Sequence, residues 1–232
     1  MKLNEIMKSI LPDESNYIIG FANMKGLLND EYKKYNHALV IGKKLNSEII
    51  DSIENGPNME YYNHYCEVNK KLEEMAFSIS EDFTSMQISN TVVKPTIMDS
   101  GLDKRYSETL RTNFSHKMAA TRAGLGWIGK TALFVSEKLG PRLRLATILL
   151  EFDSELNISP ITKSKCGNCD ICVKKCPAGA ANGILWDTTV DRDIFFDAKK
   201  CREKCKELSK LNLDKSMSIC GICVSVCPYG KK

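Results

Sequence analysis

The residues in this sequence whose types and spacing point most directly to chemistry are cysteines near the C-terminal end. The chain has 10 cysteines, and all except Cys66 lie beyond residue 165. The stretch CGNCDICVKKCP has the spacing C-x2-C-x2-C-x3-C-P, formed by Cys166, Cys169, Cys172 and Cys176. Three thiolates at this spacing can bind three corners of one [4Fe–4S] cubane, while the fourth points away to a second cluster. The spacing therefore predicts iron–sulfur clusters and electron transfer.

A second cysteine motif, CGICVSVCP, supplies Cys220, Cys223 and Cys227 but lacks one nearby ligand. That ligand must come from Cys201 or Cys205 in AKKCREKCKEL. Two-cluster ferredoxins exchange one ligand between their motifs. Crossed ligation assigns one cluster to Cys166, Cys169, Cys172 and Cys227, and the other to Cys176, Cys220, Cys223 and one of the upstream pair. Structural zinc also takes four cysteines, but a triple C-x2-C-x2-C is too dense for one tetrahedral ion.

A glycine-rich stretch, AGLGWIGKTAL at 123–133, fits two nucleotide-binding patterns at once. It contains both G-x-G-x-x-G and G-x-x-x-x-G-K-T, and both patterns need a buried strand before the loop and a helix after it. The preceding FSHKMAATRA has helical composition, and the following segment is interrupted by Gly140 and Pro141. We therefore disfavour a nucleotide site. Two interpretations stay open: a backbone that approaches a ligand closely, or a tight turn beneath a buried tryptophan.

The elements that must position these residues alternate between apolar strands and amphipathic helices. We expect strands at 17–22, at 37–42, within NTVVKPTIMDSG and within RLRLATILLEF, where Arg142 and Arg144 would share one strand face. We expect helices at 47–56, at 60–83 and in HKMAATRA. Cys66 lies within the long helix and is expected to be a small buried hydrophobe. The cysteine distribution predicts two domains, 1–160 and 161–232.

Composition narrows the class of protein further. The chain has 232 residues, 43% of them hydrophobic, and a formal net charge of +4 that is not gathered into one run. No apolar run approaches the roughly 20 residues that a membrane span requires, and the N-terminus resembles no secretory signal. We therefore expect a cytoplasmic protein with no membrane partner, in which clustered thiols hold metal rather than form disulfides. A DNA- or RNA-binding iron–sulfur protein is disfavoured by the scattered charge.

Four segments together resemble the epoxyqueuosine reductase family and its shorter relatives. They are AATRAGLGWIGKTALFV, LATILLEF, CGNCDICVKKCPAGA and CGICVSVCPYG. The resemblance implies an α+β fold, with a nitroreductase-like, cobalamin-binding α/β sandwich followed by a two-[4Fe–4S] ferredoxin-like domain. It also implies an oxidoreductase, whose clusters pass electrons from an external low-potential donor such as ferredoxin or flavodoxin to a corrinoid. The substrate would be a small molecule or a modified nucleoside.

The resemblance also implies roles for particular residues. Gly124, Gly126 and Gly129 would let the backbone approach the corrin, Trp127 would pack nearby, and His116, Lys117 and Lys130 would donate hydrogen bonds to its rim. The segment FDAKKC favours Cys201 over Cys205 as the eighth cluster ligand. Asp99, in IMDSG, is the candidate proton donor, and a simple turn-forming aspartate is an equally weighted alternative.

Two departures from the family pattern keep an alternative function open. Asp99 lies further from AGLGW than the family's aspartate does, because DKRYSETLRTNFS intervenes. The helical-repeat extension that contributes to tRNA binding in the family does not follow the second cysteine motif, so a nucleic-acid partner is not expected. The alternative is a ferredoxin-like electron-transfer or activating protein that reduces a corrinoid or flavin belonging to a partner.

Overall fold

The computed structural model describes residues 15–96, 104–152 and 157–231. The chain divides into two compact units. The first contains Met1–Lys44, Val68–Leu125 and Arg144–Pro160, and the second contains Leu45–Glu67, Gly126–Leu143 and Ile161–Lys232. One boundary falls at the predicted residue 160. The second unit also contains Leu45–Glu67 and Gly126–Leu143, which the predicted division at residue 160 assigns to the first domain.

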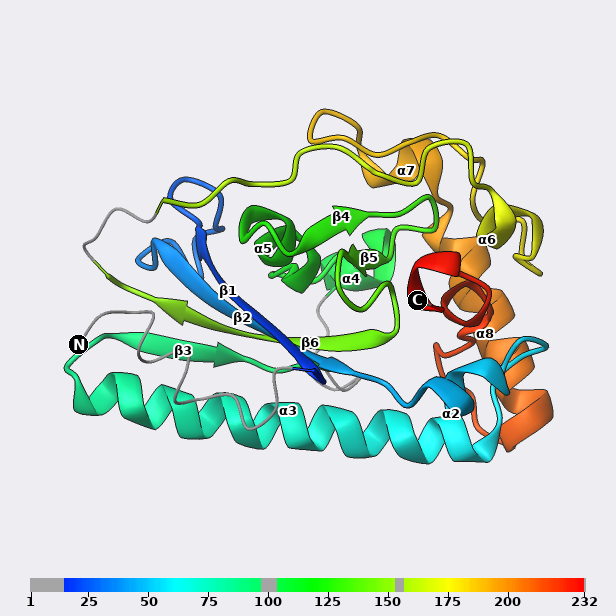
Figure 1. Cartoon of the computed structure of the whole chain (residues 1–232), viewed down its shortest axis with the longest axis horizontal. Coiled ribbons are helices and arrows are strands. Elements are labelled where there is room, and N and C mark those ends of the chain that lie inside the picture. Colours follow the sequence, from blue (N-terminus) through cyan, green and yellow to red (C-terminus); the bar gives the residue numbers. More distant parts are fainter. Residues whose placement is uncertain (1–14, 97–103, 153–156, 232) are drawn as a thin grey trace. The chain divides into compact units, whose positions relative to one another are not determined.

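A four-stranded sheet forms the centre of the first unit, in the order β1-β2-β6-β3 (Figure 1). Its strands are β1 (Tyr17–Asn23), β2 (His37–Lys44), β3 (Asn90–Val93) and β6 (Leu143–Leu150). β1 pairs with β2 and β3 pairs with β6, each antiparallel. The two central strands, β2 and β6, are buried along most of their length, which explains why they read as nearly continuous apolar runs. All four strands lie in segments where the sequence predicts them.

The helix α3 (Met59–Ser85) confirms the predicted long amphipathic helix. Val68, Leu72, Ile79 and Phe83 are all buried, as their helical spacing predicts. Within the first unit, the Asn90 amide at the start of β3 donates to the Ser80 carbonyl at 3.2 Å and to the Thr84 hydroxyl at 3.0 Å. These bonds hold the C-terminal half of α3 beside the sheet (Figure 1).

Two shorter helices complete the first unit, α4 (Lys104–Thr109) and α5 (His116–Arg122). The hydroxyl of Ser115 caps α5 by accepting from the Met118 N–H at 3.2 Å. The helix ends at Arg122, and Gly124, which follows the C-cap Ala123, has a φ of +72°. The N–H groups of Gly124 and Leu125 donate to the carbonyls of Thr121 and Ala120, which is the hydrogen-bond pattern of a Schellman motif. This glycine therefore terminates a helix.

The second unit is built from short elements and long connections. Its helices are α2 (Ser47–Asp51), α6 (Ile171–Lys174), α7 (Arg192–Phe195), α8 (Ala198–Leu213), α9 (Ile222–Ser225) and the 3-10 turn η2 (Pro228–Gly230). Its strands, β4 (Gly126–Ile128) and β5 (Phe134–Ser136), form an antiparallel hairpin. The helix predicted over 47–56 ends earlier, at Asp51, because the chain continues as turns to Gly56.

The helices of the described segments give one further result. None of them is both long and apolar enough to cross a lipid bilayer.

Candidate metal centre

The cysteines of the two motifs are carried by turns and single-turn helices of the second unit. Cys172 lies in α6 and Cys223 in α9, two helices that pack against each other. Cys166 begins a turn in which its carbonyl accepts from the Cys169 N–H at 3.1 Å, and Cys227 precedes η2. Short helices in this setting depend on their surroundings for stability, since isolated helices of this length do not persist in water. Bonds to a metal cluster would supply that stability.

A first group consists of the four thiols that crossed ligation assigns to one cluster, a ligand set that stays a prediction. Burial and, to a smaller extent, the charges of Cys227, Cys166 and Cys169 together raise the pKa of Cys172 to about 11. Burial also raises the pKa of Cys227, with Cys166 and Cys169 again contributing. Cys227 is thus an electrostatic neighbour of the three cysteines of the first motif, although more than 50 residues separate them in sequence. Iron would replace these protons, because the thiolate is the metal ligand.

A second group joins α8 to the second motif. The Sγ atoms of Cys201 and Cys205 lie 3.9 Å apart. A hydrogen bond from Cys205 lowers the pKa of Cys220 to about 7, while hydrogen bonds with Cys201 and Cys220 raise the pKa of Cys205. Burial raises the pKa of Cys223, and the charges of Cys220 and Cys201 contribute to the rise. The thiols of the second motif therefore interact with Cys201 and Cys205, the pair from which the fourth ligand of that motif is expected.

The remaining predicted ligand, Cys176, follows α6. Its N–H donates to the Val173 carbonyl at 3.3 Å, which places it one turn beyond Cys172. Among the described residues, no three His, Cys, Asp or Glu side chains converge tightly enough to hold a single metal ion. Sulfurs around one zinc lie about 3.8 Å apart, because each Zn–S bond is about 2.3 Å long. The four ligands of a cubane bind four different irons, so they need not converge as tightly as the ligands of one ion.

The glycine–tryptophan stretch forms the β4–β5 hairpin, and this hairpin lies beside the first group of thiols. Trp127 is 1% exposed, and its indole N–H donates to Cys166 Sγ at 3.4 Å. The Tyr229 ring meets the indole edge-on, with centroids 4.9 Å apart. Trp127 is therefore a buried residue of the cluster-binding unit.

Contacts within the second unit explain why glycines flank Trp127. A Cβ at Gly126 would lie 2.1 Å from the Val135 carbonyl oxygen, on the partner strand of the hairpin. A Cβ at Gly129 would lie 3.1 Å from Val135 Cγ2 and 3.7 Å from Cys166 Sγ. Of the two interpretations that the sequence left open, these contacts favour the tight turn beneath a tryptophan. A role of the same glycines in corrin binding stays a prediction.

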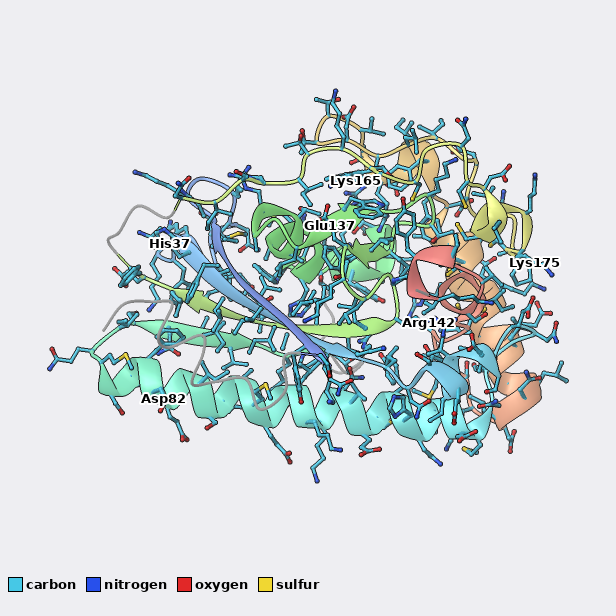
Figure 2. All side chains as sticks on the ribbon, in the orientation of Figure 1. His37, Asp82, Glu137, Arg142, Lys165 and Lys175 are labelled. Carbon is cyan, nitrogen blue, oxygen red and sulfur yellow. The ribbon has the colours of Figure 1, made fainter. Side chains whose placement is uncertain are left out.

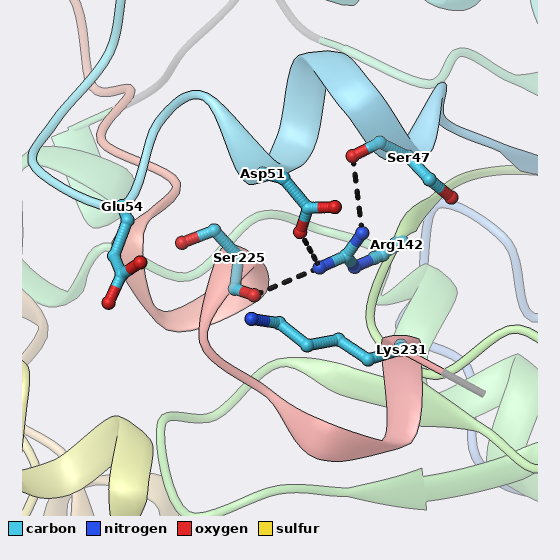
Figure 3. A pocket seen from close by; sticks show the side chains of 7 residues that line it. Ser47, Asp51, Glu54, Arg142, Ser225 and Lys231 are labelled. Carbon is cyan, nitrogen blue, oxygen red and sulfur yellow. Dashed lines mark hydrogen bonds and ion pairs between the residues drawn. The ribbon is translucent and has the colours of Figure 1, made fainter.

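The sequence predicts that Arg142 shares one face of a strand with Arg144 and assigns it no further role, but the structure places it outside that strand. It precedes β6, is 1% exposed, and donates to the carbonyls of Ser225 at 3.0 Å and Ser47 at 3.2 Å (Figures 2 and 3). It also bonds the Asp51 carboxylate at 2.5 Å, and this hydrogen bond lowers the pKa of Asp51. Because Ser225 lies between Cys223 and Cys227, Arg142 fixes the loop that contributes to both thiol groups.

A cavity of about 280 Å³ lies around this guanidinium. It is lined by Ser47, Asp51, Glu54, Arg142, Ser225, Gly230 and Lys231 (Figure 3). A Cβ at Gly230 would lie 2.7 Å from Arg142 Nε, so the absence of a side chain lets the chain pass directly over the arginine. The cavity is lined by residues of both charges and by no cysteine. It therefore belongs to the contacts by which Arg142 holds the loop between Cys223 and Cys227, and it is not a cluster site.

The residues expected to donate to a corrin rim have differing surroundings. In the first unit, His116 Nε2 lies 2.9 Å from the Lys94 carbonyl and Nδ1 lies 2.8 Å from the Thr147 hydroxyl. Nε2 must therefore donate, and Nδ1 must accept. Desolvation lowers the pKa of His116 to about 4, so the ring is neutral at pH 7. Both ring nitrogens are engaged inside the unit, and a role of His116 in donating to a corrin rim stays a prediction. Lys117 is half-buried, and Lys130 is 6% exposed.

Two further predictions concern Asp99 and Cys66. Asp99 lies outside the described residues, so its role as a proton donor stays a prediction. Cys66 is exposed, and the expectation of a buried hydrophobe was wrong. The physical reason is its position on α3: it is offset by two residues, or about 200°, from buried Val68 and so falls on the opposite face of the helix.

Comparison with known families identifies the class to which the metal centre belongs. Residues 165–230 match the family model described as a 4Fe-4S double cluster binding domain. This match confirms the prediction of two [4Fe–4S] clusters in the C-terminal part of the chain, and the matched range includes all the proposed ligands.

Curated relatives extend the likeness beyond the cluster domain. The chain is 31% identical to an epoxyqueuosine reductase of Cyclobacterium marinum over 114 residues, which covers 48% of this chain and 36% of that protein. It is also 31% identical to an epoxyqueuosine reductase of Listeria monocytogenes over 121 residues, covering 48% of this chain and 28% of the relative. The matched stretches thus span about a third of the relatives' length. They support the resemblance drawn from the sequence.

Solved structures agree on the fold. A catabolic reductive dehalogenase in complex with 3-bromo-4-hydroxybenzoic acid aligns with a TM-score of 0.66 at 17% identity, over 93% of this chain and 30% of that chain. An epoxyqueuosine reductase aligns with a TM-score of 0.62 at 17% identity, over 98% of this chain and 65% of that one. The expected mixed α and β fold, shared by these two kinds of reductase, is confirmed.

Proposed function

We propose that this chain is an iron–sulfur reductase of the epoxyqueuosine reductase type, in which two clusters pass electrons to a corrinoid. The observation that carries the proposal is the pairing of Cys227 with Cys166, Cys169 and Cys172, within a segment that matches a double-cluster domain. Cluster ligands exchanged between two motifs bring two clusters close together, which suits electron transfer from one to the other.

Different residues would hold the two clusters and support them. Cys166, Cys169, Cys172 and Cys227 would hold one cluster, and Cys176, Cys201, Cys220 and Cys223 the other. Arg142 holds the loop between Cys223 and Cys227, and buried Trp127 donates a hydrogen bond to Cys166. A low-potential donor such as ferredoxin or flavodoxin would supply the electrons.

Cobalamin is the proposed electron acceptor because one structural neighbour, a reductive dehalogenase, is described by a mechanism of B12-dependent dehalogenation. When bound, cobalamin would supply a strongly reducing cobalt centre. The residues of this chain fit the group in part: Lys117 and Lys130 stay candidate donors to its amide rim, whereas His116 and Gly126 are engaged in internal contacts. That internal engagement favours a second candidate, an electron-transfer or activating protein that reduces a partner's corrinoid or flavin.

For the substrate, we propose an electrophilic small molecule or modified nucleoside. One neighbour of this fold is an epoxyqueuosine reductase solved with an epoxyqueuosine-modified tRNA stem loop, and it aligns with a TM-score of 0.59 at 18% identity. Its ligand makes a modified nucleoside the first substrate class to test.

The experiment that separates the two candidates is an ultraviolet–visible spectrum. Anaerobically purified protein would be incubated with hydroxocobalamin and then desalted. Corrin bands that remain with the protein in about one-to-one ratio support the reductase. Intact cluster absorbance with no retained corrin would reject the reductase and favour the electron-transfer protein.

A further inference from the structure

We infer that the β4–β5 hairpin sets the reduction potentials of both clusters, because Trp127 hydrogen-bonds a ligand of one cluster and Thr131 a ligand of the other. The inference rests on the two clusters of the proposed function and is independent of its corrinoid. It also gives a role to the GWIGKT stretch, which resembles a nucleotide-binding loop in sequence but forms a β hairpin in this fold.

Trp127 supplies the first contact. An indole N–H is a donor only, and here it is directed at Cys166 Sγ at 3.4 Å. The ring cannot easily turn away, because Tyr229 packs against it edge-on and the Tyr229 hydroxyl is itself tied to the Lys165 carbonyl at 2.9 Å. At 1% exposure the indole has no access to water as a competing partner.

Thr131 supplies the second contact, four residues further along the same hairpin. Its hydroxyl hydrogen-bonds the thiol of Cys223, and the residue is 7% exposed. A tight turn fixes its direction. The Gly129 N–H donates to the Leu133 carbonyl at 2.8 Å, the Ala132 N–H donates to the Gly129 carbonyl at 2.9 Å, and Ala132 adopts a φ of +56°.

Cys166 and Cys223 belong to different thiol groups, so one short hairpin contacts a ligand of each cluster. Hydrogen bonds to cluster sulfurs are one of the main determinants of cluster potential. A donor stabilises the reduced cluster more than the oxidised one, because reduction adds negative charge at the sulfurs. Removing either donor should therefore lower the potential of one cluster and leave the other nearly unchanged.

The test is a redox titration of the cluster-loaded protein, followed by electron paramagnetic resonance. In Trp127→Phe we expect the midpoint of one cluster to fall by about 59 mV, a tenfold change in its one-electron equilibrium. In Thr131→Val we expect a comparable fall at the other midpoint. Thr131→Ser should restore the wild-type value, since it keeps the hydroxyl. Trp186→Phe, at the other of the two tryptophans in the sequence, is the matched control and should shift neither midpoint.

Iron content distinguishes the possible failures. If wild type holds no iron, the proposed function itself fails. If the variants keep their iron and neither midpoint moves, or if both variants shift the same midpoint, the hairpin inference is overturned alone.

A second measurement applies if Trp127→Phe loses its cluster. Pulsed resonance of wild type labelled with ¹⁵N-indole tryptophan should detect a nitrogen coupled to one reduced cluster, and that signal should persist in Trp186→Phe. Absence of any coupling would also overturn the inference.

Discussion

The Sγ atoms of Cys201 and Cys205 lie 3.9 Å apart, one helical turn from each other on α8. This separation is close to that of two sulfurs around a single ion, and too short for two corners of one cubane. Only one of the pair can therefore ligate the second cluster. Hydrogen bonds with Cys201 and Cys220 raise the pKa of Cys205, just as burial raises the pKa of the proposed ligands Cys172 and Cys223. The prediction of Cys201 therefore rests on the resemblance of FDAKKC to the family segment that delivers this ligand.

Replacing Cys201 by alanine should therefore leave one corner of the second cluster without a ligand. We expect the cluster to be lost or converted to a three-iron form, which iron analysis and paramagnetic resonance of the oxidised protein would report. Cys205→Ala should keep its full iron content. Iron loss in Cys205→Ala but not in Cys201→Ala would reverse the ligand assignment.

Replacing Arg142 by methionine should destabilise the second unit. The change leaves the carbonyls of Ser225 and Ser47 without this donor, at a cost of about 2 to 4 kcal/mol. Guanidinium titration under anaerobic conditions, followed by cluster absorbance, would measure it. Lys210→Met is a suitable control, because Lys210 and Asp214 form an exposed ion pair that contributes little. Equal unfolding midpoints for both variants would argue against the role of Arg142 in holding the loop between Cys223 and Cys227.

Acidification should destabilise the first unit through His116. Its pKa is lowered from 6.5 to about 4 in the folded chain, so the unfolded state binds a proton first as the pH falls. Stability is therefore full above pH 6.5 and declines between pH 6.5 and 4, by up to about 3 kcal/mol. Thermal unfolding by circular dichroism at pH 7.5 and 5 would show the decline. His116→Gln should flatten this dependence, and an unchanged pH profile in that variant would refute the assignment.

How much could be foreseen from the sequence differs between the two units. The first follows local rules: apolar runs became β1, β2 and β6, and helical spacing became α3. The cysteine spacing likewise leads to the expectation that Cys227 completes the first motif's cluster, and that ligand set stays a prediction. The surroundings of Trp127 and Arg142 could not be read in this way, because their partners Cys166 and Ser225 lie far along the chain. The sequence did not predict the exposure of Cys66, because cysteine is usually buried. Its position on the face of α3 opposite to buried Val68 leaves it exposed instead.

Gly126 provides a test of the hairpin itself. A methyl group there would meet the β5 backbone at 2.1 Å, so Gly126→Ala should force the strands apart at a cost of about 3 kcal/mol. We expect the thermal midpoint to fall by roughly 6 to 12 °C. Gly129→Ala should be milder, since its Cβ would meet a side chain that can move. A midpoint unchanged in Gly126→Ala, together with weaker cobalamin binding, would instead support direct contact of this glycine with the corrin.

The measurement that tests the central claim most directly is the metal content of the anaerobically purified chain. Two [4Fe–4S] clusters require about eight iron atoms and about eight acid-labile sulfides per chain. Dithionite reduction should then give the resonance of two interacting reduced clusters. One or two zinc atoms per chain with no iron would contradict the cluster assignment, and with it the proposed reductase.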